Sequence, residues 1–202
     1  MHGMKSPPVA IQCCAAVANL VEHTTPTAIV SLEIDRFVVD VLRVFINREE
    51  VVDEACKTIW ALATENHFLA QDLVQHHACE TLVRCVGNPK LKASVVESVC
   101  RAIHALADSP EHRQSFIDCG AVDLLRSVSR RSYLGIDVVE EVIDALKRIE
   151  EGDVVKRKSL VMSEPLDVLE SVETGADMDD ADIDDGDDAE DADDDDSVRG
   201  GK

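Results

Sequence analysis

The sequence predicts an all-α protein built from stacked helical repeats, and two observations carry that prediction. Four segments of similar pattern follow one another at intervals of 42 to 44 residues: "VAIQCCAAVANL" from Val9, "VVDEACKTIWAL" from Val51, "VVESVCRAIHAL" from Val95 and "VVEEVIDALKRI" from Val138. Helical solenoid repeats have periods of roughly 40 to 47 residues. In each segment the apolar positions also form one stripe at the period of an α-helix, so each segment is predicted to be a long amphipathic helix.

A cysteine recurs at one position of this stripe. Cys14, Cys56 and Cys100 occupy it in the first three segments, and Ile143 takes the place in the fourth. A small, weakly polar thiol permits close packing between helices. Because the position also accepts isoleucine, we expect these cysteines to fill the core rather than to react or to bind metal.

Two shorter helices are predicted between successive long ones. In "SPEHRQSFIDCGAVDLLRSV" Ser109 is a candidate N-cap, Pro110 suits the first helical position and Gly120 ends the first short helix. The segment "HFLAQDLVQHHACETLVRCV" has the same layout, with His77 in place of the glycine, and residues 24–45 repeat it without a glycine. Each repeat is therefore expected to contain two short helices and one long helix.

This arrangement resembles the armadillo repeat, and "FIDCGAVDLL" followed by "VVEEVIDALKRI" is close to the pattern of that family. The resemblance covers residues 8–151 and implies an armadillo-type right-handed α-solenoid of about three repeats. HEAT repeats, which lack the glycine turn, are the near alternative, and Gly120 disfavours them. The first long helix has no short pair before it, so we expect either that it caps the array or that the sequence is a fragment of a longer one.

The resemblance also implies a function, because the long helices of armadillo proteins line a concave groove. We expect a non-enzymatic scaffold or adaptor that binds extended peptide segments there. The groove side of the four segments is expected to carry Gln12, Ala15, Asn19, Glu54, Lys57, Ala61, Ser98, Arg101, Ala105, Glu141, Asp144 and Arg148. The asparagine and tryptophan ladder of importin-α-like members is kept only at Asn19. Trp60 lies at the edge of this side and is expected to pack between helices.

The predicted partner-binding residues are Asn19, Lys57, Arg101 and Arg148. Lys57 and Arg101 resemble the catenin type of groove, which receives acidic segments, and arginine can hold a carboxylate through two hydrogen bonds. A second interpretation stays open for two of them. Asp53 and Lys57, like Glu97 and Arg101, are spaced four residues apart on a helix. Such pairs stabilise an exposed helix by roughly 0.2 to 0.5 kcal/mol each without binding anything else.

The net charge of -21 is concentrated in "DMDDADIDDGDDAEDADDDD", residues 177–196. A segment with like charges and almost no large apolar side chains is predicted to stay disordered. We therefore divide the chain into an armadillo array (8–151), a linker or C-terminal cap (152–176) and a disordered acidic tail (177–202). The negative charge argues against direct binding to nucleic acid. The alternative function is a chaperone-like shield for basic proteins, with the tail as its active part; the tail is also predicted to compete for the groove cations.

No catalytic motif or cofactor loop is found, so neither an enzyme nor a cofactor is predicted. His76, His77, Cys79 and Cys85 are close enough in sequence to suggest zinc, but no second ligand cluster accompanies them, and packing is the preferred interpretation. Seven cysteines without a secretory leader suggest reduced thiols in the cytoplasm or nucleus. No apolar stretch approaches the length of about 18 residues that a membrane span needs, so no membrane association is expected.

Overall fold

The computed structural model describes residues 6–162, with side chains up to Glu151, and every regular element in this part is helical. The order is α1 (Pro7–Leu20), a 3-10 turn (Val21–His23), α2 (Pro26–Ser31), α3 (Ile34–Val44), α4 (Glu49–Glu65), α5 (His67–Gln75), α6 (Ala78–Gly87), α7 (Ala93–Leu106), α8 (Pro110–Asp118), α9 (Ala121–Val128) and α10 (Ile136–Met162).

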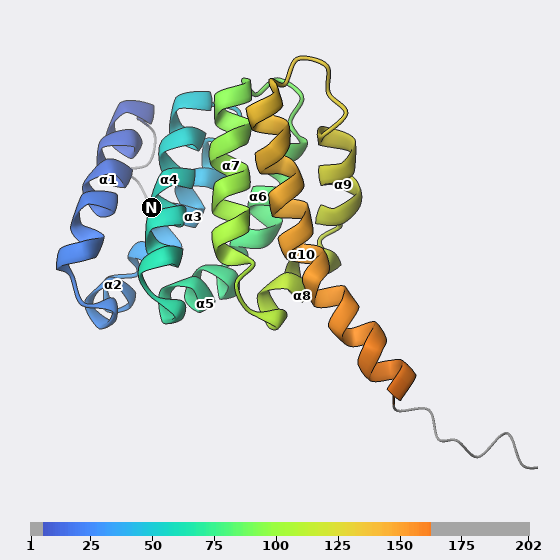
Figure 1. Cartoon of the computed structure of the whole chain (residues 1–202). Helices are drawn as coiled ribbons and strands as arrows, with labels where there is room; N and C mark the ends of the chain where they lie inside the picture. Colours follow the sequence, from blue (N-terminus) through green and yellow to red (C-terminus); the bar gives the residue numbers. More distant parts are fainter. Residues whose placement is uncertain (1–5, 163–202) are drawn as a thin grey trace, which may run out of the picture. The chain divides into compact units, whose positions relative to one another are not determined.

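Two short helices and one long helix recur three times, as α2–α4, α5–α7 and α8–α10. The long helices α1, α4, α7 and α10 stand side by side, each packed on the next (Figure 1). The all-α repeat architecture is therefore as predicted. Helix α1 precedes the first complete repeat without a short pair of its own, and α10 continues past Glu151 into the predicted linker. The acidic tail lies outside the described residues.

Local sequence sets the starts of the short helices. The Ser109 hydroxyl accepts a hydrogen bond from the backbone N–H of His112 at 3.2 Å, with Pro110 in the first turn of α8, as expected. In the preceding repeat Asn66 plays the same part for α5, because its side-chain oxygen accepts from the N–H of Phe68 at 2.8 Å. Both caps satisfy donors that the first helical turn leaves free.

A left-handed residue joins the two short helices in all three repeats. Gly120 has φ 75°, and the corresponding His77 and Glu33 have φ 66° and 52°. The sequence shows this turn only at Gly120, since the other two residues have a Cβ that makes the conformation unfavourable. The left-handed turn is therefore present in all three repeats, although the side chains of His77 and Glu33 disfavour it.

The recurring cysteines lie in the core, as predicted. Cys14, Cys56 and Cys100 are fully buried between neighbouring helices. Burial raises the pKa of the Cys14 and Cys100 thiols to about 12 and holds the pKa of Cys56 well above its usual value. These thiols stay protonated at neutral pH, which makes them poor nucleophiles and poor metal ligands.

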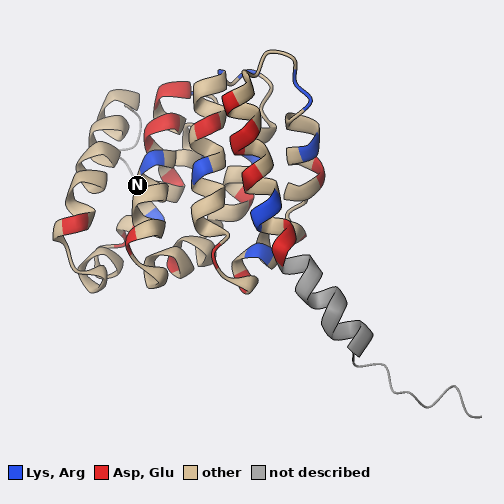
Figure 2. Ribbon diagram, viewed as in Figure 1, with Lys and Arg blue, Asp and Glu red and all other residues tan. Residues whose placement is uncertain are grey.

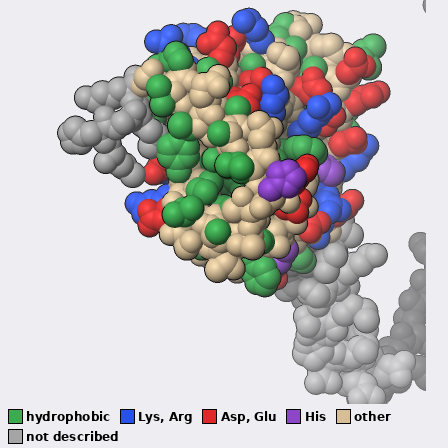
Figure 3. Space-filling model, turned by 90° about the vertical axis from the view of Figure 1, so that its left-hand side faces the viewer, with side chains coloured by type: hydrophobic (Ala, Val, Ile, Leu, Met, Phe, Trp, Pro, Cys, Tyr) green, Lys and Arg blue, Asp and Glu red, His purple; other side chains and the backbone are tan. Residues whose placement is uncertain are grey.

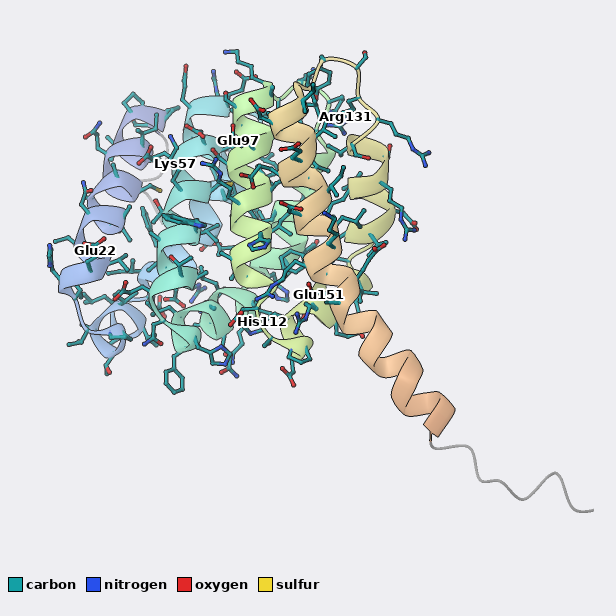
Figure 4. The ribbon with its side chains drawn as sticks, in the orientation of Figure 1. Glu22, Lys57, Glu97, His112, Arg131 and Glu151 are labelled. Carbon is teal, nitrogen blue, oxygen red and sulfur yellow. The ribbon has the colours of Figure 1, made fainter. Side chains whose placement is uncertain are left out.

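Polar groups connect one repeat to the next. The Thr58 hydroxyl on α4 lies 3.1 Å from the carbonyl oxygen of Cys14 on α1. The guanidinium group of Arg131, which follows α9, donates to the carbonyl oxygens of Val86 and Gly87 at the end of α6, both at 3.1 Å. Figure 4 shows Arg131 in the loop above α9. Within the described part, no helix combines the length and apolar character needed to cross a membrane.

Candidate functional site

The exposed sides of α1, α4, α7 and α10 form one surface, which we call the ladder face. It consists of Gln12, Ala15, Asn19, Asp53, Glu54, Lys57, Trp60, Ala61, Glu97, Ser98, Arg101, His104, Ala105, Asp108, Glu141, Asp144, Lys147, Arg148 and Glu151. All four predicted binding residues belong to it. Asn19, Lys57 and Arg101 are exposed, and Arg148 is half-buried.

Lys57 is held within its own helix. Its Nζ lies 2.7 Å from Oδ2 of Asp53, and this hydrogen bond raises the pKa of Lys57. The other carboxylate oxygen of Asp53 accepts a hydrogen bond of 2.6 Å from the Ser98 hydroxyl on α7. Figure 4 shows Lys57 and Glu97 at similar heights on the neighbouring helices α4 and α7. The predicted pair at i and i+4 is thus present and also connects two repeats.

Arg101 faces two carboxylates. Its Nη2 lies 2.6 Å from Oε1 of Glu97, one turn earlier on α7, and its Nε lies 3.2 Å from Oε1 of Glu141 on α10. The first contact confirms the pair expected from the spacing. The second joins α7 to α10 and was not predicted, because it depends on how the two long helices are aligned.

Arg148 also lies between two carboxylates. Its Nη2 is 2.7 Å from Oδ1 of Asp108, just after α7, and its Nη1 is 3.4 Å from Oε2 of Glu151. Arg113 on α8 reaches the same Glu151 oxygen at 3.4 Å. Arg148 is therefore part of a network that joins the end of α7, α8 and α10 at one end of the ladder face.

Negative charge exceeds positive charge on this surface. Its carboxylates are Asp53, Glu54, Glu97, Asp108, Glu141, Asp144 and Glu151, and its cations are Lys57, Arg101, Lys147 and Arg148. Figure 2 shows both signs interspersed along α4, α7 and α10. Most of these side chains are partly exposed, so each ion pair contributes little to stability. The surplus of carboxylates nevertheless makes the net charge of the surface negative.

Trp60 corrects one expectation from the sequence. Its side chain is 48% exposed on α4 rather than packed between helices. The preceding residues Thr58 and Ile59 are fully buried and already fill the interior of the array. Trp60 instead follows Lys57 by three residues, which places both on the exposed side of the helix. That spacing was the signal in the sequence, and His104 holds the same position after Arg101 on α7.

The four residues considered as zinc ligands, His76, His77, Cys79 and Cys85, lie in different surroundings. Cys79 and Cys85 are buried in α6, where burial raises the pKa of each thiol to about 12. His76 Nε2 lies 3.1 Å from Oδ2 of the buried Asp35 on α3, and His77 forms the left-handed turn. Among the described residues, no group of three or more His, Cys, Asp or Glu side chains is arranged to hold a metal ion.

Comparison with known proteins identifies the fold. No family model and no curated protein sequence matches the chain. Among solved structures, a designed armadillo repeat protein is 22% identical, with a TM-score of 0.59 over 72% of this chain and 60% of that one. The chain has an armadillo-type repeat fold.

Two further armadillo-type structures support this result. One is titled as computationally designed armadillo repeat proteins for modular peptide recognition, at 23% identity and TM-score 0.60, covering 79% of this chain and 66% of that one. The other is a designed armadillo repeat protein in complex with the peptide (KR)4, at 17% identity and TM-score 0.55, covering 81% and 77%. In this armadillo-type solenoid, α4, α7 and α10 are the third helices of three repeats.

Proposed function

We propose that this armadillo-type solenoid is a non-enzymatic scaffold that binds an extended peptide segment along the ladder face. Stacked repeats place equivalent side chains of successive long helices in a regular row, which suits a chain that runs across the helices. Two of the similar designed structures carry peptide recognition or a bound peptide in their titles. Those titles describe the designed proteins; in this chain the ladder face itself supports peptide binding.

The charge of that surface favours a basic segment. Arg101 and Arg148 each face two carboxylates, and Lys57 is bound to Asp53. An acidic ligand would have to compete with these internal partners for every cation. A segment rich in lysine and arginine would instead meet the surplus carboxylates. This single observation carries the choice of a basic partner over the acidic partner expected from the sequence.

Trp60 adds a contact site for a lysine or arginine side chain of the ligand. Its side chain is 48% exposed, and the equivalent positions next to it on α4 and α7 carry the small residues Ala61 and Ala105. A lysine or arginine of the ligand can pack its aliphatic chain on the ring, and its charge can lie over the ring face. Such a cation–π contact is worth about 0.5 to 1 kcal/mol at an exposed site.

Trp60 is the only tryptophan of the chain, so its fluorescence reports on the ladder face directly. We expect an alternating lysine–arginine peptide to change the Trp60 emission, with an affinity that falls as salt is added. An aspartate–glutamate peptide of the same length should leave it unchanged. The double variant Glu97→Gln, Glu141→Gln should bind the basic peptide at least severalfold more weakly, because it removes two carboxylates of the face.

The matched control is Asp123→Asn with Glu33→Gln, two carboxylates that are 94% and 71% exposed outside the ladder face. It should bind like the unchanged protein. If the unchanged protein binds the acidic peptide and the double variant Lys57→Glu, Arg101→Glu does not, the acidic-ligand hypothesis is restored. A lack of response to both peptides would contradict the proposed function.

The acidic tail supports a second candidate, a shield for basic proteins. Its twenty-residue run, 177–196, consists almost entirely of acidic residues and alanine, which suits non-specific attraction of cationic clients. A chain ending at Gly175 separates the two functions. If the ladder face is the binding site, the Trp60 response to the basic peptide survives this truncation; if the tail is the active element, binding of basic proteins is lost with it.

A further inference from the structure

The loops that lead into the long helices α4, α7 and α10 carry positive charge only. They are residues 45–48, 88–92 and 129–135, and none of them contains Asp or Glu. Their cations form a surface that we call the cationic edge: Arg48, Lys90, Lys92, Arg130 and Arg131. The segments that follow the long helices contain no Lys or Arg and carry Glu22 and Asp108 instead. The loops of one edge are therefore positive in a chain whose net charge is -21.

Hydrogen bonds join the three loops into one surface. The side-chain amide of Asn88 donates to Oδ1 of Asn47 at 3.5 Å. The backbone N–H of Lys92 donates to Oε1 of Glu49 at 3.1 Å, which also connects the loop before α7 to the start of α4. Arg131 joins the loop before α10 to the end of α6. Figure 1 shows α4, α7 and α10 beginning at the same upper edge, and Figure 3, viewed from the α1 end, shows Lys and Arg side chains along that edge with acidic ones beside them.

The middle loop is held in place before any ligand binds. Leu91 is 2% exposed and anchors the loop in the core, whereas Lys90 and Lys92 on either side of it are exposed. The side-chain oxygen of Asn88 accepts a hydrogen bond from the backbone N–H of Lys90 at 3.0 Å, in a local turn of the kind that asparagine favours. A loop that is already ordered loses little conformational entropy on binding, and this favours affinity.

Helix stability does not account for two of these cations. Arg48 and Lys92 are the N-cap residues of α4 and α7, and neither side chain makes a cap hydrogen bond. Side chains with an oxygen acceptor are preferred at this position, and a positive charge there opposes the helix dipole. An ion pair of 2.8 Å with Glu49 offsets the charge of Lys92. Arg48 has no ion-pair partner within residues 6–151.

The edge differs from the ladder face in how its cations are paired. Arg48, Lys90 and Arg130 are exposed and have no carboxylate partner within residues 6–151, whereas every Lys and Arg of the ladder face has one. Glu50 and Asp137 lie in the first turns of α4 and α10, but α7 has no acidic residue in its first turn. The criterion that makes the ladder face suitable for a basic segment therefore makes this edge suitable for an acidic one.

We infer that the cationic edge binds an extended acidic segment of a partner protein, which runs across the loops before α4, α7 and α10. Packed helices lie about 8 to 10 Å apart, so three successive loops span about 20 Å, the length of about six residues of extended chain. Three unpaired cations match a few carboxylates, whereas nucleic acid needs many phosphate contacts and is repelled by the rest of this acidic chain. The edge uses no residue of the ladder face, so the inference does not depend on the proposed function.

Fluorescence anisotropy of a labelled alternating aspartate–glutamate peptide tests this inference with the full chain. The peptide is expected to bind, with an affinity that falls as salt is added. Arg130→Gln should weaken binding about two- to fivefold, the worth of one exposed ion pair, and Lys90→Gln, Arg130→Gln should weaken it further. The control is Arg36→Gln, which removes the same charge from a side chain that is 47% exposed on α3, outside the edge. It should bind like the unchanged protein, and equal weakening by Arg36→Gln and Arg130→Gln would overturn the inference.

The position of the peptide is tested by NMR. Tyr133 is the only tyrosine of the chain, and its hydroxyl lies 3.3 Å from Nη1 of Arg131. Its ring resonances should shift when the acidic peptide binds, while the indole N–H of Trp60 stays unmoved. A shift of Trp60 without Tyr133 would place the peptide on the ladder face and overturn the inference.

The remaining outcomes concern the occupant of the edge. Binding by a chain that ends at Gly175 but not by the full chain would assign the edge to the acidic run 177–196 and overturn a partner's segment as its ligand. Tighter binding of a single-stranded oligonucleotide of the same charge would transfer the edge to nucleic acid. A lack of peptide binding by both chains overturns the inference outright.

Discussion

At the turn between the short helices of each repeat, three different residues adopt the same left-handed conformation. Only Gly120 is suited to it, whereas His77 and Glu33 have a Cβ that opposes it. The surrounding helices therefore hold two residues in an unfavourable conformation. Similar strain at functional sites can be part of a mechanism, but here it recurs with the repeat and belongs to the fold.

Exchanging the residues at this turn should change stability in opposite directions. His77→Gly is expected to raise the free energy of unfolding by about 0.5 kcal/mol, since relief of the left-handed strain is partly offset by the greater freedom of glycine in the unfolded chain. Gly120→Ala should lower it by about 1 kcal/mol. No atom lies within 4 Å of the position of the added methyl group, so this loss is conformational. Urea denaturation measures both, and destabilisation by His77→Gly would contradict the argument.

A second residue-scale prediction concerns pH. His112 on α8 is buried, and its Nδ1 lies 3.0 Å from the carbonyl oxygen of Leu106. Burial lowers the pKa of His112 below its usual value near 6.5, because the charged form is poorly solvated. The unfolded chain then binds a proton at a higher pH than the folded chain does. Stability should be full above about pH 6.5 and fall as the pH decreases toward the folded pKa.

The His112→Asn variant isolates this effect, because its amide can still donate a hydrogen bond but does not titrate. It should be less stable than the unchanged protein at pH 7.5, with a smaller further loss on going to pH 5.5. Thermal unfolding at several pH values measures the difference. An equal loss in both proteins would assign the pH dependence to other groups.

At the scale of elements, bonds between repeats hold neighbouring helices in register. The clearest example is Arg131, whose guanidinium group closes the end of α6 from the loop after α9. The carbonyl oxygens at a helix end need such partners, and a charged donor strengthens the bond. Arg131 thus does for α6 what a local C-cap would do, but from the next repeat.

Arg131→Ala should therefore destabilise the array. We expect a loss of about 1 to 3 kcal/mol, since two carbonyl groups lose a charged donor. The adjacent Arg130 is exposed and serves as the control: Arg130→Ala should change stability by less than about 0.5 kcal/mol. Urea denaturation with hydrogen exchange at the end of α6 would show the effect, and equal losses in the two variants would contradict it.

The elements were predictable where the signal lies within one helix. The stripe of apolar residues gave the long helices and the burial of Cys14, Cys56 and Cys100, and Ser109 gave the start of α8. Contacts between repeats were not predictable in the same way. The bond from Arg101 to Glu141 joins residues forty positions apart and follows from the alignment of α7 with α10. The left-handed conformation of His77 and Glu33 also had no local signal.

At the scale of the whole molecule, periodicity was sufficient to predict a solenoid of helical repeats, because its core repeats one interface between long helices; the armadillo type was implied by the resemblance of the segments around Gly120 to that family. The predicted binding residues lie on one exposed side of the long helices, but the net charge of this side depends on which acidic side chains lie beside them. The sequence led us to expect acidic ligands at Lys57 and Arg101, and the structure places Asp53, Glu97 and Glu141 against these cations, which supports the basic ligand proposed above.

The most direct measurement is a two-dimensional amide NMR titration of the full chain with an alternating lysine–arginine peptide. The account predicts shifts concentrated on the ladder face of α4, α7 and α10, including the indole N–H of Trp60, and weaker shifts in the Glu97→Gln, Glu141→Gln variant. Shifts confined to residues 177–196, with the Trp60 indole unmoved, would contradict it and transfer the binding to the acidic tail.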